Sequence, residues 1–248
     1  MRKYFILVFL LFVFGCSDTK LETPETEGEK LQILYSNAME LVRDKDFVDA
    51  AILFEDIERQ YPYSKWSNQA QLMTGFCYYK ARMYDESLDA LERFMALYPG
   101  SKKISYAYYL RALNYFEQIR DVERDQSMAV RSKQAFSEVL NKYPESEFAD
   151  DAKSKIDIIN DRLSAKEIEI ARYYQFSSQW ISAINRYNGI LEQYSDSVYT
   201  EEALFRLVEI YFSLGLYEEA KRYASTLGYN FPESDWYKKS YEIVKDLT

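Results

Sequence analysis

Histidine is absent from this 248-residue chain, and cysteine, glycine and proline are scarce, at two, seven and five residues. Without histidine, the chain lacks the commonest general base, the usual zinc ligand and every Ser-His or Cys-His nucleophile pair. Acidic pairs such as Asp150 and Asp151 are adjacent in sequence. Neighbours on a helix point about 100° apart, so such pairs do not converge as an acid/base couple would. We therefore predict a protein that is not an enzyme and that needs neither a metal nor a cofactor.

Basic residues are in the minority, since 31 Lys and Arg face 40 Asp and Glu, for a net charge of −9. Without Arg2 and Lys3 at the N-terminus the balance is 29 − 40 = −11. A nucleic-acid binder needs basic surface to displace counterions, so we expect no nucleic-acid partner. The same balance argues against electrostatic adhesion to anionic lipid.

Disorder is excluded by a hydrophobic content of 48% and an aromatic content of 17%. The scarcity of glycine and proline is typical of an all-α protein with short loops.

Long hydrophobic runs are missing as well. The N-terminal run at 4–14 has 11 residues, whereas a membrane-spanning helix needs about 20. It follows the basic Met1-Arg2-Lys3, which predicts a signal peptide over residues 1–15. The run ends in Val-Phe-Gly-Cys at 13–16, which resembles a bacterial lipobox, although Phe14 stands where a small residue is usual. The alternative is a plain secretory signal in which Cys16 is accidental.

Residues 16–30 are polar and acidic, with a single Leu, and we interpret them as a flexible tether. Ser17 after the cysteine resembles the Gram-negative sorting pattern for the outer membrane. Lipid on Cys16 would then supply the membrane affinity and leave the folded body in the periplasm. Cys77 lies inside an apolar helix pattern, so we expect it to be buried and inert.

A corner of an aromatic residue, proline and serine recurs along the rest of the chain. Its five copies are YPYS at 61, YPGS at 98, YPES at 143, YSDS at 194 and FPES at 231, spaced by 37, 45, 51 and 37 residues. Proline stops a helix, and the serine is a candidate N-cap for the next one. Periods in the mid-thirties with two helices per unit indicate a tetratricopeptide-type helical solenoid.

Apolar residues at i, i+3, i+4 and i+7 predict five helix pairs and a C-terminal capping helix. The pairs span 31–61, 66–98, 104–143, 147–194 and 200–231, and the cap spans 235–247. The fourth pair opens with a long helix over 147–176. We take it to divide an N-terminal lobe, residues 31–146, from a C-terminal lobe, residues 147–248.

Small and large residues occupy complementary positions within the pairs. In the second pair, Gly75 is the small residue that lets the helices approach, and Ser87 and Leu91 match the later small and large positions. Tyr78 fits the aromatic core position.

Residues 121–197 carry further motifs in a fixed order. They are Glu-Arg-Asp at 123–125, Lys-Gln-Ala-Phe at 133–136, Asp-Arg-Leu-Ser-Ala-Lys-Glu at 161–167, Tyr-Tyr at 173–174 and Trp-x-x-Ala-Ile-Asn-Arg at 180–186. With the lipobox and tether, they resemble the BamD family, the lipoprotein tetratricopeptide subunits of the outer-membrane β-barrel assembly machinery. The resemblance covers about residues 31–248.

The resemblance implies a scaffold that promotes β-barrel insertion. Its C-terminal lobe would dock on the BamA-type central subunit, and its N-terminal lobe would receive segments of unfolded outer-membrane proteins. Arg186 matches a docking arginine of the family; the alternative is an ion pair with Glu192 or with an acid on the long helix. Asn185 is a weaker candidate, and Arg124 and Asp125 would either hold the charged insertion at 119–128 or touch a partner.

Tyrosines on the first helices of the N-terminal lobe are candidates for the client groove, because a tyrosine ring grips varied extended peptides. They are Tyr35, Tyr79, Tyr108 and Tyr109. About half of the aromatic residues on these helices are expected to be core packing instead.

Two other functions are open to such a chain. One is another periplasmic tetratricopeptide lipoprotein that links envelope or cell-division partners. The other is a hydrolase with accessory repeats, for which the chain has no room outside the repeats.

Overall fold

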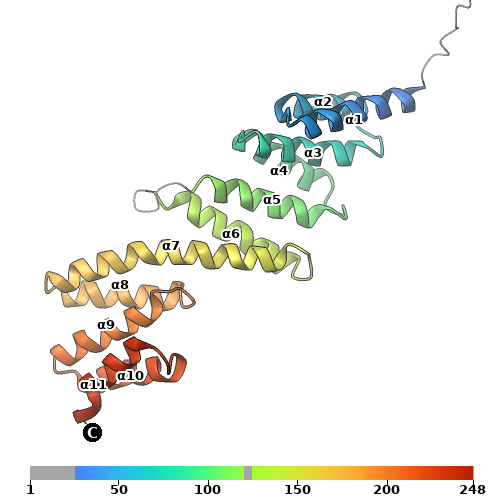
Figure 1. The fold of residues 1–248 in the computed structure, drawn as a ribbon. Helices are drawn as coiled ribbons and strands as arrows, with labels where there is room; N and C mark the ends of the chain where they lie inside the picture. Colours follow the sequence, from blue (N-terminus) through green and yellow to red (C-terminus); the bar gives the residue numbers. More distant parts are fainter. Residues whose placement is uncertain (1–25, 120–124, 248) are drawn as a thin grey trace, which may run out of the picture.

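The computed structural model describes residues 26–119 and 125–247, and every regular element in them is helical (Figure 1). The predicted signal peptide, Cys16 and Arg124 lie outside the described residues. The helices are α1 Glu27–Asp44, α2 Phe47–Gln60, α3 Ser67–Lys80, α4 Tyr84–Leu97, α5 Ile104–Glu117, α6 Ser127–Lys142, α7 Ala149–Phe176, α8 Trp180–Gln193, α9 Thr200–Ser213, α10 Tyr217–Asn230 and α11 Asp235–Val244, followed by the 3₁₀ turn η1 Lys245–Leu247. This is the predicted solenoid of five pairs and a cap.

Helix α1 begins within the predicted tether. Thr26 caps it, because its hydroxyl accepts a hydrogen bond from the Glu29 N–H while the Glu29 carboxylate accepts one from the Thr26 N–H. This reciprocal capping box satisfies two backbone donors at once. The first turn of α1 thus covers residues 27–30, which composition alone assigned to the tether.

The turn inside a helix pair has the same geometry in four pairs. One residue adopts the left-handed conformation, with φ of 67° at Lys45, 62° at Arg82, 59° at Ser178 and 74° at Gly215. The N–H of the following residue returns to the carbonyl five residues earlier at 2.9 Å, as from Leu216 to Tyr211. This arrangement satisfies a carbonyl at the end of the first helix.

The aromatic corners between pairs also repeat. At all five, the serine N–H donates to the carbonyl of the aromatic residue at 2.9–3.1 Å. The predicted N-cap role is confirmed at Ser234, whose hydroxyl accepts from the Trp236 N–H at the start of α11. It is wrong at the other corners, because an extra turn separates the serine from the helix: α3 begins at Ser67, three residues after Ser64.

The small and large positions pack as expected. A Cβ at Gly75 would lie 2.8 Å from Leu91 Cγ, and the Ser87 hydroxyl donates to the Gly75 carbonyl at 2.7 Å. In the third pair, the Ser132 hydroxyl donates to the Ala112 carbonyl at 3.3 Å. In these two pairs, a small residue on the first helix therefore lets a serine of the second helix reach the first helix's backbone.

Helix α7 contributes to two hydrophobic cores, and Figure 1 shows it lying between α6 and α8. Its 28 residues span about 42 Å. Ile159 and Leu163 pack with Phe136 of α6, whereas Ile168 and Ala171 pack with residues of α8 and α9. The helix that opens the C-terminal lobe therefore shares the core of the third pair.

The C-terminal cap closes the last pair through aromatic contacts. Trp236 of α11 packs on Phe205 of α9, with ring centroids 5.1 Å apart. A Cβ at Gly228 would lie 2.4 Å from the ring of Tyr237, so this glycine lets α11 approach α10. Among the described residues, no helix is long and apolar enough to cross a membrane.

Candidate functional site

A cleft of about 440 Å³ lies where the start of α6 meets α7 and α8. It is lined by Gln126, Glu167, Asn185, Arg186, Gly189, Gln193 and Tyr194. Two of the docking residues predicted from sequence, Asn185 and Arg186, line it together. Asp125, a third, precedes the lining residue Gln126. The fold therefore gathers these three predicted residues at one place.

Arg186 is held over the cleft by the long helix. Its Nη1 donates to Glu167 Oε2 at 2.8 Å. Arg186 therefore forms the ion pair with an acid on the long helix that was the alternative to a docking role. This hydrogen bond raises the pKa of Arg186, which stays charged at any physiological pH. Both side chains remain partly exposed. A guanidinium has five N–H donors in a planar fork. Arg186 can therefore donate hydrogen bonds to a second carboxylate while it keeps its hydrogen bond to Glu167.

Asp125 lies two residues before the start of helix α6. Its carboxylate accepts from the Ser127 N–H at 2.8 Å and from the Ser127 hydroxyl at 2.9 Å. These hydrogen bonds, with smaller contributions from Lys166 and Arg131, lower its pKa. Asp125 therefore holds the first residue of α6, and its role toward a partner stays a prediction.

Lys133 fastens α6 to the end of α8 at the edge of the cleft. Its ammonium donates to the Gln193 carbonyl at 3.2 Å and lies 4.9 Å from the centre of the Tyr194 ring. A cation beside the carbonyl end of a helix is favourable. Burial lowers the pKa of Lys133. Lys133 therefore connects α6 to the end of α8 beside the cleft, across 60 positions of sequence.

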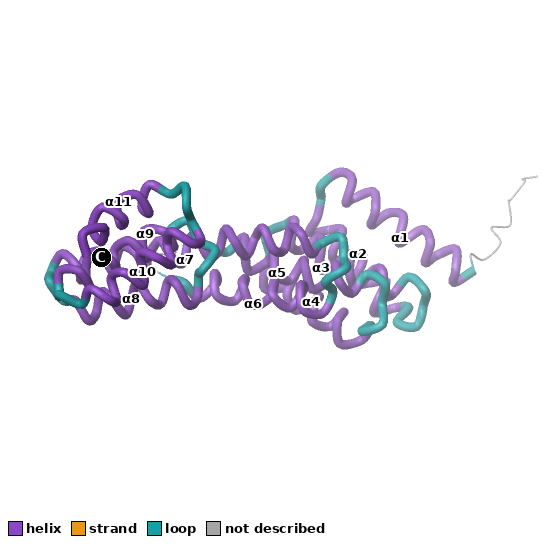
Figure 2. The backbone as a smooth tube through the Cα atoms, turned by 90° about the horizontal axis from the view of Figure 1, so that it is seen from below, coloured by secondary structure: helices purple, strands orange, loops and turns teal. Residues whose placement is uncertain are grey.

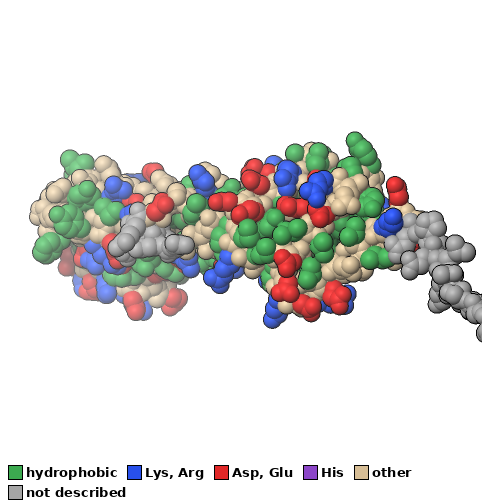
Figure 3. Space-filling view, turned by 90° about the horizontal axis from the view of Figure 1, so that it is seen from above, with side chains coloured by type: hydrophobic (Ala, Val, Ile, Leu, Met, Phe, Trp, Pro, Cys, Tyr) green, Lys and Arg blue, Asp and Glu red, His purple; other side chains and the backbone are tan. Residues whose placement is uncertain are grey.

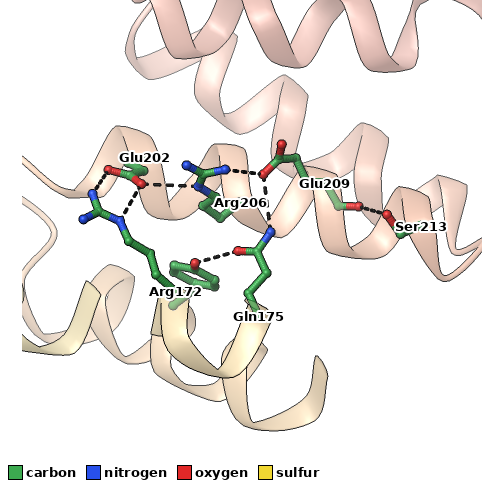
Figure 4. A network of polar contacts seen from close by, with 7 residues as sticks. Arg172, Gln175, Glu202, Arg206, Glu209 and Ser213 are labelled. Carbon is green, nitrogen blue, oxygen red and sulfur yellow. Dashed lines mark hydrogen bonds and ion pairs between the residues drawn. The ribbon is translucent and has the colours of Figure 1, made fainter. Parts of the chain in front are cut away.

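A network of polar contacts stiffens the C-terminal lobe between α7 and α9 (Figure 4). Arg172 donates to both oxygens of Glu202 at 2.9 and 2.5 Å, and Arg206 donates to Glu202 at 3.3 Å and to Glu209 at 2.8 Å. Gln175 completes the network with a 3.4 Å hydrogen bond to Glu209. Burial alone would raise the pKa of Glu202, but the two arginines outweigh it and leave the pKa lowered.

The predicted groove tyrosines are half-buried, and each has an aromatic partner. Tyr35 packs 4.6 Å from Trp66, and Tyr108 packs 5.3 Å from Tyr143. Tyr109 stacks on Phe148 at 4.9 Å. Each of the three therefore has a packing role in addition to any role in binding.

Tyr109 also connects the N-terminal lobe to α7, since its hydroxyl donates to Asp151 Oδ2 at 2.5 Å. The hydroxyl of Tyr108 accepts from Lys142 Nζ at 3.2 Å. The ring of Tyr79 lies 6.4 Å from that of Tyr84, and burial raises its pKa to about 12.

Tyr106, which the sequence reasoning missed, belongs with Tyr79 and Tyr109. Burial is the main cause that raises the pKa of Tyr106 to about 12, with a smaller contribution from Tyr79. Burial and the Asp151 hydrogen bond raise the pKa of Tyr109, and Tyr79 and Tyr106 contribute less. The rings of Tyr106 and Tyr109 both pack on Phe148, with centroids 5.3 and 4.9 Å away. Residues three apart share a helix face, whereas adjacent ones do not. The spacing of Tyr106 and Tyr109 on α5 was the signal that could have found this cluster.

The fold and the cleft define a tetratricopeptide-type helical solenoid, a class of protein whose stacked repeats present extended binding surfaces. In the part of the chain that the structure describes, no group of His, Cys, Asp and Glu is placed to hold a metal ion. Cys77 is fully buried, as expected, and is a free cysteine in the part of the chain that the structure describes.

Comparison with known proteins gives the family. The profile of the YfiO family, described as outer membrane lipoprotein, matches residues 28–227, and the chain belongs to this family. It is 42% identical over 235 residues to outer membrane protein assembly factor BamD of Caulobacter vibrioides, covering 94% of this chain and 77% of that protein. It is 39% identical over 241 residues to the BamD of Rickettsia prowazekii, covering 97% and 95%.

Among solved structures, the fold of this chain is similar to that of PilW, a widely conserved type IV pilus biogenesis factor. It superposes with a TM-score of 0.39 at 18% identity and covers 85% of this chain and 98% of that chain. A likeness at this level has no bearing on function.

Proposed function

We propose that the protein is an outer-membrane assembly factor that docks on the central β-barrel subunit of the assembly machinery, of the BamA type, through the cleft around Arg186. The observation that carries this proposal is the convergence of Asn185, Arg186 and the start of α6 on one cleft. Family membership and relatives named as assembly factors support the same role. The body would face the periplasm, held to the outer membrane by lipid on Cys16.

Docking uses chemistry that the cleft already displays. The exposed fork of Arg186 suits bidentate binding of a partner carboxylate, which gives geometric specificity as well as affinity. Glu167 keeps the guanidinium oriented in the free protein, at 2.8 Å, so less conformational entropy is lost on binding. The side-chain amide of Asn185 supplies a further donor and acceptor.

The N-terminal lobe would receive unfolded outer-membrane protein segments. Tyr79, Tyr106 and Tyr109 form its best-supported surface, because their rings are packed: Tyr106 and Tyr109 both lie against Phe148, and Tyr79 lies against Tyr84. Rings fixed by neighbours lose little freedom when a peptide binds. Tyr35 and Tyr108 are weaker candidates for peptide binding, because each already has a structural partner. Tyr35 packs on Trp66, and the Tyr108 hydroxyl accepts a hydrogen bond from Lys142.

Co-purification from native membranes tests the docking. Wild type should bring down the barrel subunit, and Arg186→Glu should bring down much less with unchanged helicity. Arg222→Glu is the matched control, because Arg222 is an exposed arginine of α10 that is likewise paired to an acid, Glu219. Equal recovery with Arg186→Glu and wild type would remove the cleft from the interface. Absence of a barrel subunit in every sample would refute the proposed function.

A further inference from the structure

Large apolar side chains are exposed at the tips of the last two helix pairs. Phe176 is 91% and Ile181 is 77% exposed at the α7–α8 tip. Leu214, Leu216 and Tyr217 are exposed at the α9–α10 tip. We name these five side chains, with Tyr173 and Phe212, the apolar edge. Both tips lie on the same edge of the C-terminal lobe in Figures 1 and 2, and Figure 3 shows hydrophobic side chains gathered at that end of the molecule.

The fold does not require apolar residues at these positions. The left-handed residues Lys45 and Gly215 mark equivalent points of the first and fifth tips. Their neighbours are Asp44 and Asp46 in the first pair but leucines in the fifth. Phe176 stands two residues before the left-handed Ser178 of the fourth pair. At the equivalent position, two residues before the left-handed residue, the first pair has Arg43 and the second pair has Lys80. A cation is the favourable residue near a helix C-terminus, so the phenylalanine is explained by something other than the turn.

Charge is missing from the same edge. Residues 173–185 and 210–217 contain no Asp, Glu, Lys or Arg, in a chain that is 29% charged. Depletion of charge with enrichment of aromatic residues characterises the buried centre of protein interfaces. Exposed apolar patches rimmed by polar residues mark such sites.

The apolar edge continues into the cleft along one face of α8. Ile181, Asn185 and Gly189 follow at intervals of four, so they share the solvent-facing side of the helix. Asn185 and Gly189 line the cleft, and a Cβ at Gly189 would meet nothing within 4 Å. A partner seated in the cleft therefore reaches Ile181 without leaving this face.

The direction of the chain disfavours lipid as the occupant. Helix α1 begins at the edge opposite the hairpin tips in Figure 1. A tether that enters α1 there would place that edge, and not the apolar edge at the tips, toward the membrane.

We propose that the apolar edge and the cleft form one continuous docking surface for a single folded protein partner, the central β-barrel subunit. We further propose that the apolar edge supplies most of the affinity. This inference rests on the proposed function and names the partner's surface: uncharged and apolar over the tips, with an acidic group placed to meet Arg186. The apolar contact supplies affinity that salt does not screen, whereas the Arg186 contact weakens as salt rises.

The test measures the affinity of the full-length, detergent-solubilised protein for the full-length barrel subunit at low and high salt. The double variant Phe176→Ser, Ile181→Ser should weaken binding about tenfold or more at both salts. Arg186→Glu should weaken it mainly at low salt. Tyr229→Ser is the matched control, since Tyr229 is 89% exposed outside the edge, and it should bind like wild type. Circular dichroism checks that all variants keep wild-type helicity.

The outcomes separate the two proposals. Unchanged affinity of the double variant, with weakened binding by Arg186→Glu, overturns the inference and leaves the proposed function standing. Wild type that does not bind the barrel subunit refutes the proposed function and the inference with it. The inference is also overturned if the double variant keeps its partner affinity but loses self-association in sedimentation, or binding to vesicles of outer-membrane phospholipid.

Discussion

Replacing glycine by alanine in two helices should change stability in opposite directions. Gly75 lies inside α3, and a Cβ there would stand 2.8 Å from both Cγ and Cδ2 of Leu91, which is fully buried. Gly189 lies inside α8, and a Cβ there would meet nothing within 4 Å. The same methyl group is therefore added to a closed site and to an open one.

The magnitudes follow from two effects. Alanine in a helix interior is favoured over glycine by about 1 kcal/mol, and this gain applies to both variants. Overpacking a filled core costs about 1–3 kcal/mol, and it applies only at Gly75 because Leu91 Cγ cannot swing away as a chain end could. We expect Gly189→Ala to stabilise the protein by about 0.5–1 kcal/mol. Gly75→Ala should lose up to about 2 kcal/mol, and the difference between the two isolates the contact.

Urea titration followed by circular dichroism at 222 nm measures both variants against wild type. The midpoint should rise for Gly189→Ala and fall for Gly75→Ala, with unchanged slopes. Midpoints that rise equally for both variants would refute the close packing of α3 on α4.

Three further predictions concern single side chains. Ala183→Glu should unfold the C-terminal lobe, because Ala183 is fully buried and the charge would have no partner; an unchanged melting curve would show that the placement is wrong. The Cys77 thiol should be unreactive toward a thiol reagent at pH 8 until urea unfolds the chain, since burial raises its pKa to about 12; immediate labelling of folded protein would contradict this. Glu202→Gln should cost about 1–3 kcal/mol at pH 7. Because the folded pKa of Glu202 lies below its ordinary 4.5, the difference from wild type should shrink as pH falls below that value; a pH-independent difference would exclude the ion pairs as its cause.

The recurring corner determined most of the fold in advance. Proline and an aromatic residue end a helix by local chemistry, so the five pairs and the cap could be placed from sequence. The start of α1 was missed, because the acidic residues at 27 and 29 fit two interpretations. Their composition is typical of a polar tether, and their negative charge is equally typical of a helix N-terminus. Four of the five serine caps were misplaced by one turn for a similar reason: a serine serves a turn as well as a helix.

The candidate site was only partly accessible to sequence reasoning. Arg186 and Asn185 stood out through family resemblance, but Glu167 lies 19 positions away on another helix, and no periodicity links the two. Lys133 and Gln193 meet across 60 positions. Contacts of this kind depend on how the pairs stack, which local patterns do not specify. The division between lobes remains a proposal, since Leu163 of α7 packs with the third pair.

A photoreactive amino acid at Asn185, introduced in living cells, tests the docking claim most directly. Asn185 is exposed and lines the cleft, so the replacement should leave the fold intact. We predict a crosslink to the central β-barrel subunit from position 185 and none from the same label at Tyr229. A crosslink to that subunit from 229 but not from 185 would contradict the account.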